Sequence, residues 1–147
     1  MQVTIRKLRP EDAEISWKWR NDPEIWKLTG RKWYNYVTKK TEEQWIRKVI
    51  QEKDSIRFAI CVGDQEQYIG NIQLTDINEE DAFSHIFIGE KEYWGMGIGT
   101  HAVKLLFDYV KNNLTIKRIK GVVDKKNHAS IKHMKKSGFY ESHEIDE

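Results

Sequence analysis

Residues 93–100 read Tyr-Trp-Gly-Met-Gly-Ile-Gly-Thr, and this stretch is the most informative part of the chain. A strand-like run from Phe83 to Ile88 precedes it, and an amphipathic helical pattern that starts at Ile98 follows it. Glycines let the main chain approach an anion and adopt positive φ, and a helix N-terminus offers unpaired N–H groups with a partial positive charge. We therefore predict that a phosphate or pyrophosphate binds to residues 95–100. The alternative is a tight turn that only starts a helix.

The spacing of these glycines excludes the two commonest phosphate-binding loops. A P-loop carries lysine and then serine or threonine after its last glycine, whereas Gly99 is followed directly by Thr100. A dinucleotide fingerprint has the spacing GxGxxG after the first strand of a βαβ unit. Here the spacing is GxGxG, and several strand-like segments come earlier in the chain. A different phosphate-bearing ligand is implied.

A second segment indicates which ligand this is. Asn127-His128-Ala129-Ser130-Ile131 opens a predicted helix, which closes at Lys136-Ser137-Gly138-Phe139. Together the two segments resemble the GNAT N-acetyltransferase superfamily, in which such a loop binds the pyrophosphate of coenzyme A and an asparagine-led helix ending in Gly-Phe follows. The resemblance is closest to the branch of ribosomal-protein N-terminal acetyltransferases and spermidine acetyltransferases. Matches to that branch also occur at Leu8–Asp12, Trp19–Pro23, Gly70–Leu74 and Ile86–Glu90.

Composition limits the class of protein. The chain has 147 residues, of which 39% are hydrophobic and 33% charged, so we expect one domain with a real core over residues 1–147. A net charge of +2 argues against a dedicated nucleic-acid binder. The single cysteine, Cys61, forbids an internal disulfide and fits a reducing compartment. Without a long apolar stretch or a signal-peptide core, we expect a cytoplasmic protein and no membrane partner.

The pattern of elements predicts an α+β fold. Antiparallel strands come first and helices cover the sheet, in agreement with the GNAT fold that the resemblance implies, with a twisted, mostly antiparallel central sheet. Residues 23–40 are expected to be irregular. The chain stops just after a sixth strand, so we expect a sheet without the last strand of the fold. An exposed sheet edge favours a homodimer joined near residues 139–147. The predicted strands are Val3–Leu8, Ile56–Val62, Tyr68–Ile77, Ala82–Gly89, Ile116–Val123 and Phe139–Glu144, and the predicted helices start at Pro10, Thr41, Ile98 and Asn127.

The resemblance implies acetyl-CoA as co-substrate and no metal. In the family the strand before the glycine loop carries a bulge, and its backbone N–H groups pair with pantetheine and point at the thioester oxygen. By position, Phe87 and Ile88 would supply such backbone contacts here, while their side chains belong to the core. Asn127 would contact the pantetheine arm, cap its own helix, or do both. The implied coenzyme A loop comprises Trp94, Gly95, Met96, Gly97, Ile98, Gly99 and Thr100.

The general base and acid do not follow the family pattern. Phe83 stands where this branch often has a glutamate, and His85 lies two residues on, hence on the same sheet face. His85 is therefore our candidate base, with Asp81 or Glu80 as substitutes. Met134 stands where many members of the family have a tyrosine that acts as the general acid. Tyr140 or His133 would have to donate the proton instead. A thiolate also leaves well without an acid. These gaps leave open a non-catalytic acyl-CoA-binding module of the same fold.

The acceptor side is expected in the first helix, the aromatic stretch after it and the helix over residues 41–53. We predict that Trp19, Trp33 and Tyr34 wall the acceptor site, and that Arg20 and Asp22 hold a phosphate and an ammonium of the acceptor. The acceptor would be a polyamine, an amino sugar or a protein N-terminus. A polyamine would need carboxylates, which could come from Glu11, Asp12, Glu14, Glu42 and Glu43.

Overall fold

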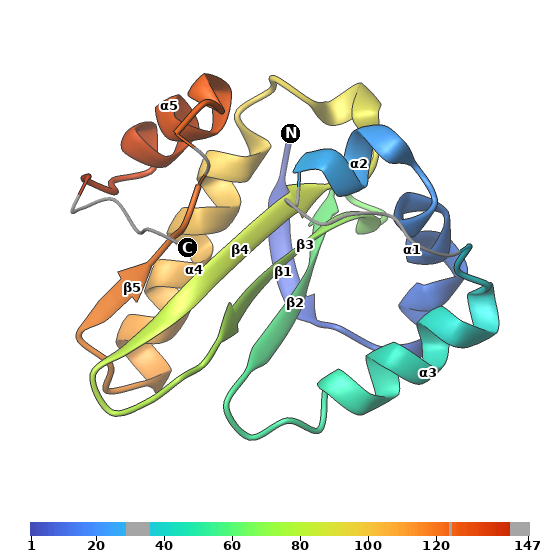
Figure 1. Cartoon of the computed structure of the whole chain (residues 1–147), viewed down its shortest axis with the longest axis horizontal. Helices are drawn as coiled ribbons and strands as arrows, with labels where there is room; N and C mark the ends of the chain where they lie inside the picture. The colour runs from blue at the N-terminus through green and yellow to red at the C-terminus, as the bar shows by residue number, and fades with distance from the viewer. Residues whose placement is uncertain (29–35, 124, 142–147) are drawn as a thin grey trace.

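The computed structural model describes residues 1–28, 36–123 and 125–141, and its elements alternate between strands and helices (Figure 1). The strands are β1 Val3–Lys7, β2 Ile56–Val62, β3 Gln67–Thr75, β4 Asp81–Ile88 and β5 Arg118–Lys120. The α-helices are α1 Ala13–Arg20, α2 Pro23–Leu28, α3 Lys39–Val49, α4 Ile98–Asn113 and α5 His128–Lys136. Short 3₁₀ turns precede α1 at Pro10–Asp12 and follow β4 at Lys91–Tyr93.

The described strands form one sheet in the order β1-β2-β3-β4-β5. The pairs from β1 to β4 are antiparallel, and β5 pairs with β4 in parallel. A parallel neighbour needs a crossover connection, and α4 provides it. The prediction of an α+β fold with a mostly antiparallel sheet is confirmed.

Helices cover both faces of this sheet, because successive side chains of a strand point to opposite faces. In β2, Phe58 and Ile60 belong to the core cluster formed with α4, whereas Ala59 and Cys61 belong to the cluster formed with α1 and α3. Figure 1 shows the same two layers, with α1, α2 and α3 on one side of the sheet and α4 and α5 on the other. We call these sides the α3 face and the α4 face.

The last two strands separate soon after they meet. β5 pairs only with Asp81, Ala82 and Phe83, while β4 continues beside β3 to Ile88. In an antiparallel pair, alternate residues exchange hydrogen bonds with the neighbouring strand, and the residues between them direct their N–H and C=O groups away from it. Alternate backbone groups of residues 84–88 therefore point away from β3, into a gap that no described strand fills.

Several predicted element boundaries were wrong for local reasons. Residues 23–40 were expected to be irregular, but α2 begins at Pro23, where a proline suits the first helical turn. The next helix begins at Lys39 rather than Thr41, because Thr38 is the N-cap and accepts a hydrogen bond from the Thr41 backbone at 3.0 Å. The strand expected over residues 116–123 has only the three residues of β5.

The sixth strand expected from Phe139 is not present over residues 139–141, and residues 142–147 lie outside the described chain. Gly138, with φ +101°, ends α5 instead. The Phe139 backbone N–H donates to the Met134 carbonyl at 3.0 Å, which is the bond of a Schellman motif. This turn directs Phe139 onto Phe107 of α4, with ring centroids 5.6 Å apart. Among the described residues, no helix has the length and apolarity needed to span a membrane.

Candidate active site

A cavity of about 480 Å³ lies where β4 and β5 separate. Its lining includes Ser84 and Ile86 from one side of β4 and His85 and Phe87 from the other. The cavity therefore reaches around the free edge of β4, from the α4 face to the α3 face. The other lining residues are Arg20, Trp45, Ile72, Gln73, Val103, Leu106, Gly121, Val122, Val123, Lys126, Asn127, Ser130, His133, Met134 and Phe139.

The glycine loop is built as an anion site would require. Gly95 and Gly97 adopt φ of +75° and +78°, in the left-handed region, and a Cβ at either position would point into open space. Gly97 is the N-cap of α4, and no side chain caps this helix. The first N–H groups of α4 therefore lack an intrahelical partner. Trp94 fastens the loop to the sheet, since its indole N–H donates to the Ile88 carbonyl at 2.8 Å.

The loop adjoins the cavity through His133. Residues 94–100 do not themselves line the cavity, but His133 of α5 does. The His133 Nε2 atom lies 2.9 Å from the position that a Cβ on Gly99 would occupy, so glycine is needed for α5 to pack this closely on α4. Burial, and to a smaller extent the nearby Lys136, lowers the pKa of His133. The imidazole is therefore neutral near pH 7.

Asn127 lies at the start of α5 and lines the cavity. Its side-chain oxygen accepts a hydrogen bond from the Ser130 backbone at 3.1 Å, so the capping role is observed. A contact with pantetheine stays a prediction.

His85 lies on the α3 face of β4 and is exposed to the cavity. Its Nε2 atom is 3.2 Å from the Thr75 hydroxyl, on the neighbouring strand. When Nε2 carries the proton and donates to Thr75, Nδ1 is the basic atom. The register of β3 with β4 runs without a shift from Phe83 to Ile88. A bulge follows directly, because the N–H groups of Gly89 and Glu90 both donate to the Ile69 carbonyl, at 2.7 and 3.2 Å.

The other two predicted catalytic residues lie away from the cavity. Asp81 is at the closed end of β4, where it accepts a hydrogen bond from Asn78 at 2.9 Å and pairs with Lys120 at 3.1 Å. These contacts, Asn78 first, lower the pKa of Asp81, which makes it a poor proton acceptor near neutral pH. Tyr140 follows α5 and is 87% exposed. Neither residue lines the cavity.

The acceptor-side predictions had different outcomes. Trp19 is a core residue rather than a cavity wall: it packs against Tyr68 and Phe87, and a Cβ on Gly89 would lie only 2.0 Å from its ring. Arg20 does line the cavity, together with Trp45. Trp33 and Tyr34 lie outside the described residues.

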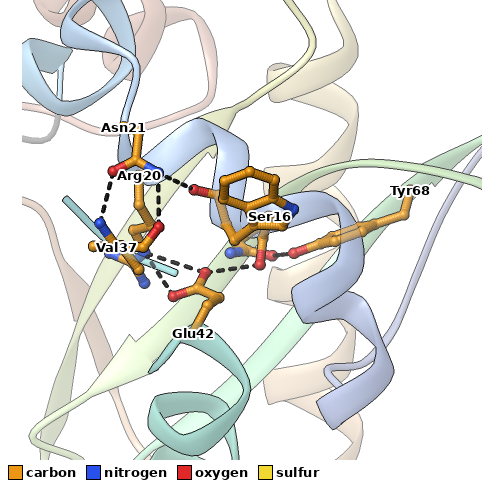
Figure 2. Close-up of polar contacts among 8 residues, drawn as sticks. Ser16, Arg20, Asn21, Val37, Glu42 and Tyr68 are labelled. Carbon is orange, nitrogen blue, oxygen red and sulfur yellow. Dashed lines mark hydrogen bonds and ion pairs between the residues drawn. The ribbon is translucent and has the colours of Figure 1, made fainter. Parts of the chain in front are cut away.

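Arg20 belongs to a buried polar network that the sequence did not reveal. Its Nε donates to both carboxylate oxygens of Glu42, at 3.2 and 3.3 Å, and Ser16 donates to Glu42 at 2.7 Å. Figure 2 shows Ser16 and Arg20 converging on the Glu42 carboxylate, with Tyr68 beside Ser16. The guanidinium also stacks over the Trp45 ring, 4.1 Å from its centroid. Ser16 and Arg20 belong to α1, whereas Glu42 and Trp45 belong to α3, so no local pattern indicates these contacts.

Residues 2–140 match the family model of the acetyltransferase (GNAT) domain. An uncharacterised N-acetyltransferase, p20 of Bacillus licheniformis, is 30% identical over 139 residues, which cover 89% of this chain and 75% of that protein. The spermidine N(1)-acetyltransferase of Escherichia coli K12 is 25% identical over 138 residues, covering 93% of this chain and 72% of that protein.

Solved structures share the fold. The spermidine N-acetyltransferase of Vibrio cholerae, in complex with CoA and spermine, superposes with a TM-score of 0.85 at 24% identity. The match covers 97% of this chain and 83% of that one. A domain from Methanocaldococcus jannaschii superposes with a TM-score of 0.80 at 23% identity, over 96% of this chain and 90% of that one.

Proposed function

This chain belongs to the acetyltransferase (GNAT) domain family, and from that membership we propose that it transfers an acetyl group from acetyl-CoA to a primary amine in a ternary complex. The observation that carries the proposal is the cavity at the separation of β4 and β5. It joins the α4 face, beside the glycine loop, to the α3 face, where His85 lies. Two substrates can therefore meet across the free edge of one strand.

The residues that would hold coenzyme A fit its chemistry. Residues 95–100 offer N–H groups at an uncapped helix start to the pyrophosphate. The free backbone groups of β4 can pair with the amides of an arm that lies in the cavity between the separated strands. We assign Asn127 and the main-chain N–H of Ile88 to this arm. Phe87 can contact it only through its side chain, because the Gly89 N–H donates to the Ile69 carbonyl and alternate residues therefore pair with β3.

The proton is assigned to His85. Acetyl-CoA, when bound, supplies a thioester whose carbonyl carbon the amine nitrogen attacks, so that an N–C bond forms, the C–S bond breaks and the thiolate leaves. The amine must lose a proton to react, and the imidazole of His85 would take it directly or through water. The hydrogen bond between the Thr75 hydroxyl and Nε2 would hold the imidazole ring in its orientation. Asp81 is held by Lys120 instead.

Thiol release from acetyl-CoA, measured against a panel of primary amines, tests this function. We expect release above the amine-free background, with a rate that rises with pH as His85 loses its proton. His85→Ala should lower turnover by about a hundredfold without changing coenzyme A affinity. His101→Ala, which removes an exposed histidine of α4 outside the cavity lining, is the control. Coenzyme A binding without release for any amine would instead identify a non-catalytic binding module.

A further inference from the structure

The ionisable side chains that line the cavity are all basic among the described residues. They are Arg20 and His85 towards the α3 face, and Lys126 and His133 beside α5. No aspartate or glutamate of the described chain lines the cavity. An acceptor with several ammonium groups would therefore meet cations rather than carboxylates on the described part of these walls, although a cation that leaves water needs a paired charge.

Three of the carboxylates that the sequence offered for an ammonium are already engaged. Glu42 is buried and accepts hydrogen bonds from Ser16 and from the cavity-lining Arg20. Asp12 pairs with Arg6 at 2.7 Å, and Asp22 pairs with Lys91 at 2.8 Å. The pairing with Lys91 lowers the pKa of Asp22 and replaces the acceptor ammonium that we expected there.

Arg20, in contrast, keeps part of its donor set available. Glu42 takes the Nε hydrogen (Figure 2). Trp45 stacks on the guanidinium, so that the plane of the group is fixed. Within the described part of the chain, neither Nη nitrogen of Arg20 donates to a protein atom. A guanidinium held in this way presents two N–H groups in a geometry that matches a carboxylate or a phosphate.

We propose that the acceptor of this enzyme is a primary amine that also carries an oxyanion, and that the Nη groups of Arg20 bind this oxyanion. The proposal rests on the proposed function, because it names the substrate class of the same site. Arg20 and His85 both lie towards the α3 face of the cavity, opposite the side assigned to coenzyme A. One end of the acceptor is thereby held by Arg20 while its amine reaches the free edge of β4.

Matched pairs of amines test the substrate class. O-phosphoethanolamine is compared with ethanolamine, β-alanine with propylamine, and spermidine represents the polyamines. We expect kcat/KM to be roughly tenfold or more higher for the anionic member of at least one pair, the scale of a charge-assisted hydrogen bond. The pair with the larger ratio identifies phosphate or carboxylate as the oxyanion. Equal values within both pairs, or a preference for spermidine, would overturn the inference.

Variants connect the preference to Arg20. Arg20→Met alone leaves Glu42 as an unpaired buried charge, so the double variant Arg20→Met with Glu42→Gln removes both charges together. We expect the ratio of kcat/KM for the anionic amine to that for its neutral counterpart to fall to about one in this double variant. The matched control, Arg47→Met with Glu43→Gln, removes an exposed ion pair of α3 outside the cavity lining and should leave the preference unchanged. A retained preference in the Arg20 and Glu42 double variant, or an equal loss in the control, would refute the role of Arg20.

A binding measurement separates this inference from the proposed function. With coenzyme A held constant, we expect the preferred anionic amine to raise the melting temperature of the wild-type protein more than its neutral counterpart, and the double variant to lose the difference. A larger rise in melting temperature with the anionic amine, without any thiol release, would support the anion site and overturn the catalytic function. Thiol release with equal melting temperatures for the two amines would support the catalytic function and overturn the anion site.

Discussion

Two glycines in this protein share one backbone conformation and differ in their surroundings. Gly63 and Gly97 both have φ +78°, and a Cβ at either would meet no atom within 4 Å. A side chain at either position would therefore pay the same backbone cost, about 1–2 kcal/mol, without a steric clash. Gly63 lies in the turn after β2, whereas Gly97 starts α4. The two positions separate backbone strain from ligand binding.

We predict that Gly97→Glu abolishes coenzyme A binding while the fold survives, because its carboxylate would repel the pyrophosphate assigned to residues 95–100. Gly63→Glu is the matched control, with the same φ and the same added charge. Titration calorimetry with coenzyme A should show binding for Gly63→Glu and none for Gly97→Glu, at similar melting temperatures. Unchanged affinity in Gly97→Glu would remove the assigned phosphate site.

At the scale of elements, α5 is held to the rest of the molecule by few buried groups. No residue of the helix itself is buried, although His133 and Met134 are partly so. Its first residue is fixed by the Asn127 cap and its last turn by Gly138. The contact of His133 with Gly99 is therefore a sensitive point of attachment, and its protonation should affect stability.

The direction of this effect follows from the lowered pKa of His133. In the unfolded chain its pKa returns to about 6.5, so below that pH the unfolded state binds more protons than the folded state. The free energy of unfolding should then fall as pH decreases from about 7 towards 5, and stay level above that window. We predict that His133→Gln reduces this slope in urea titrations. His101→Gln should keep the wild-type slope, and equal slopes in all three proteins would contradict the prediction.

The elements differ in how well the sequence predicted them, for physical reasons. β2 and α4 carry strong periodic patterns, and Asn127 and Gly138 mark the ends of α5 by local chemistry, so these elements were placed closely. β5 is short because β4 diverges from it, which depends on packing rather than on residues 116–123. Of the residues that line the cavity, Asn127, His85 and Arg20 were predicted from spacing and resemblance, whereas their roles and the phosphate site on the glycine loop stay predictions. The contact of Arg20 with Glu42 could not be predicted, because only the packing of α1 on α3 brings the two residues together.

At the scale of the whole molecule, the described sheet ends at β5, whose outer edge has no described neighbour. Val122, just after this strand, is 63% exposed, and Tyr140 after α5 is 87% exposed. Exposed strand edges and apolar side chains are commonly covered by a partner chain. The exposed edge and these two exposed side chains favour a homodimer joined near residues 139–147, which stays a prediction.

Deletion of residues 141–147 should shift the protein from dimer towards monomer or aggregate, as measured by light scattering. Tyr140→Asp should weaken the dimer in the same way, because it would place a charge in the contact. Tyr36→Asp, at another exposed tyrosine, is the control and should leave the mass unchanged. A monomeric full-length chain at high concentration would refute the prediction.

The separation of β4 from β5 also affects which mutations the cavity can accept. The free edge of β4 presents main-chain N–H and C=O groups to the cavity, and every residue except proline carries both groups. Substitutions along residues 84–88 therefore reshape the walls but leave the main-chain donors and acceptors in place. Substitutions that accumulate at these positions can change which molecules fit the cavity. The polar groups of the backbone stay in place as long as the path of the main chain is unchanged.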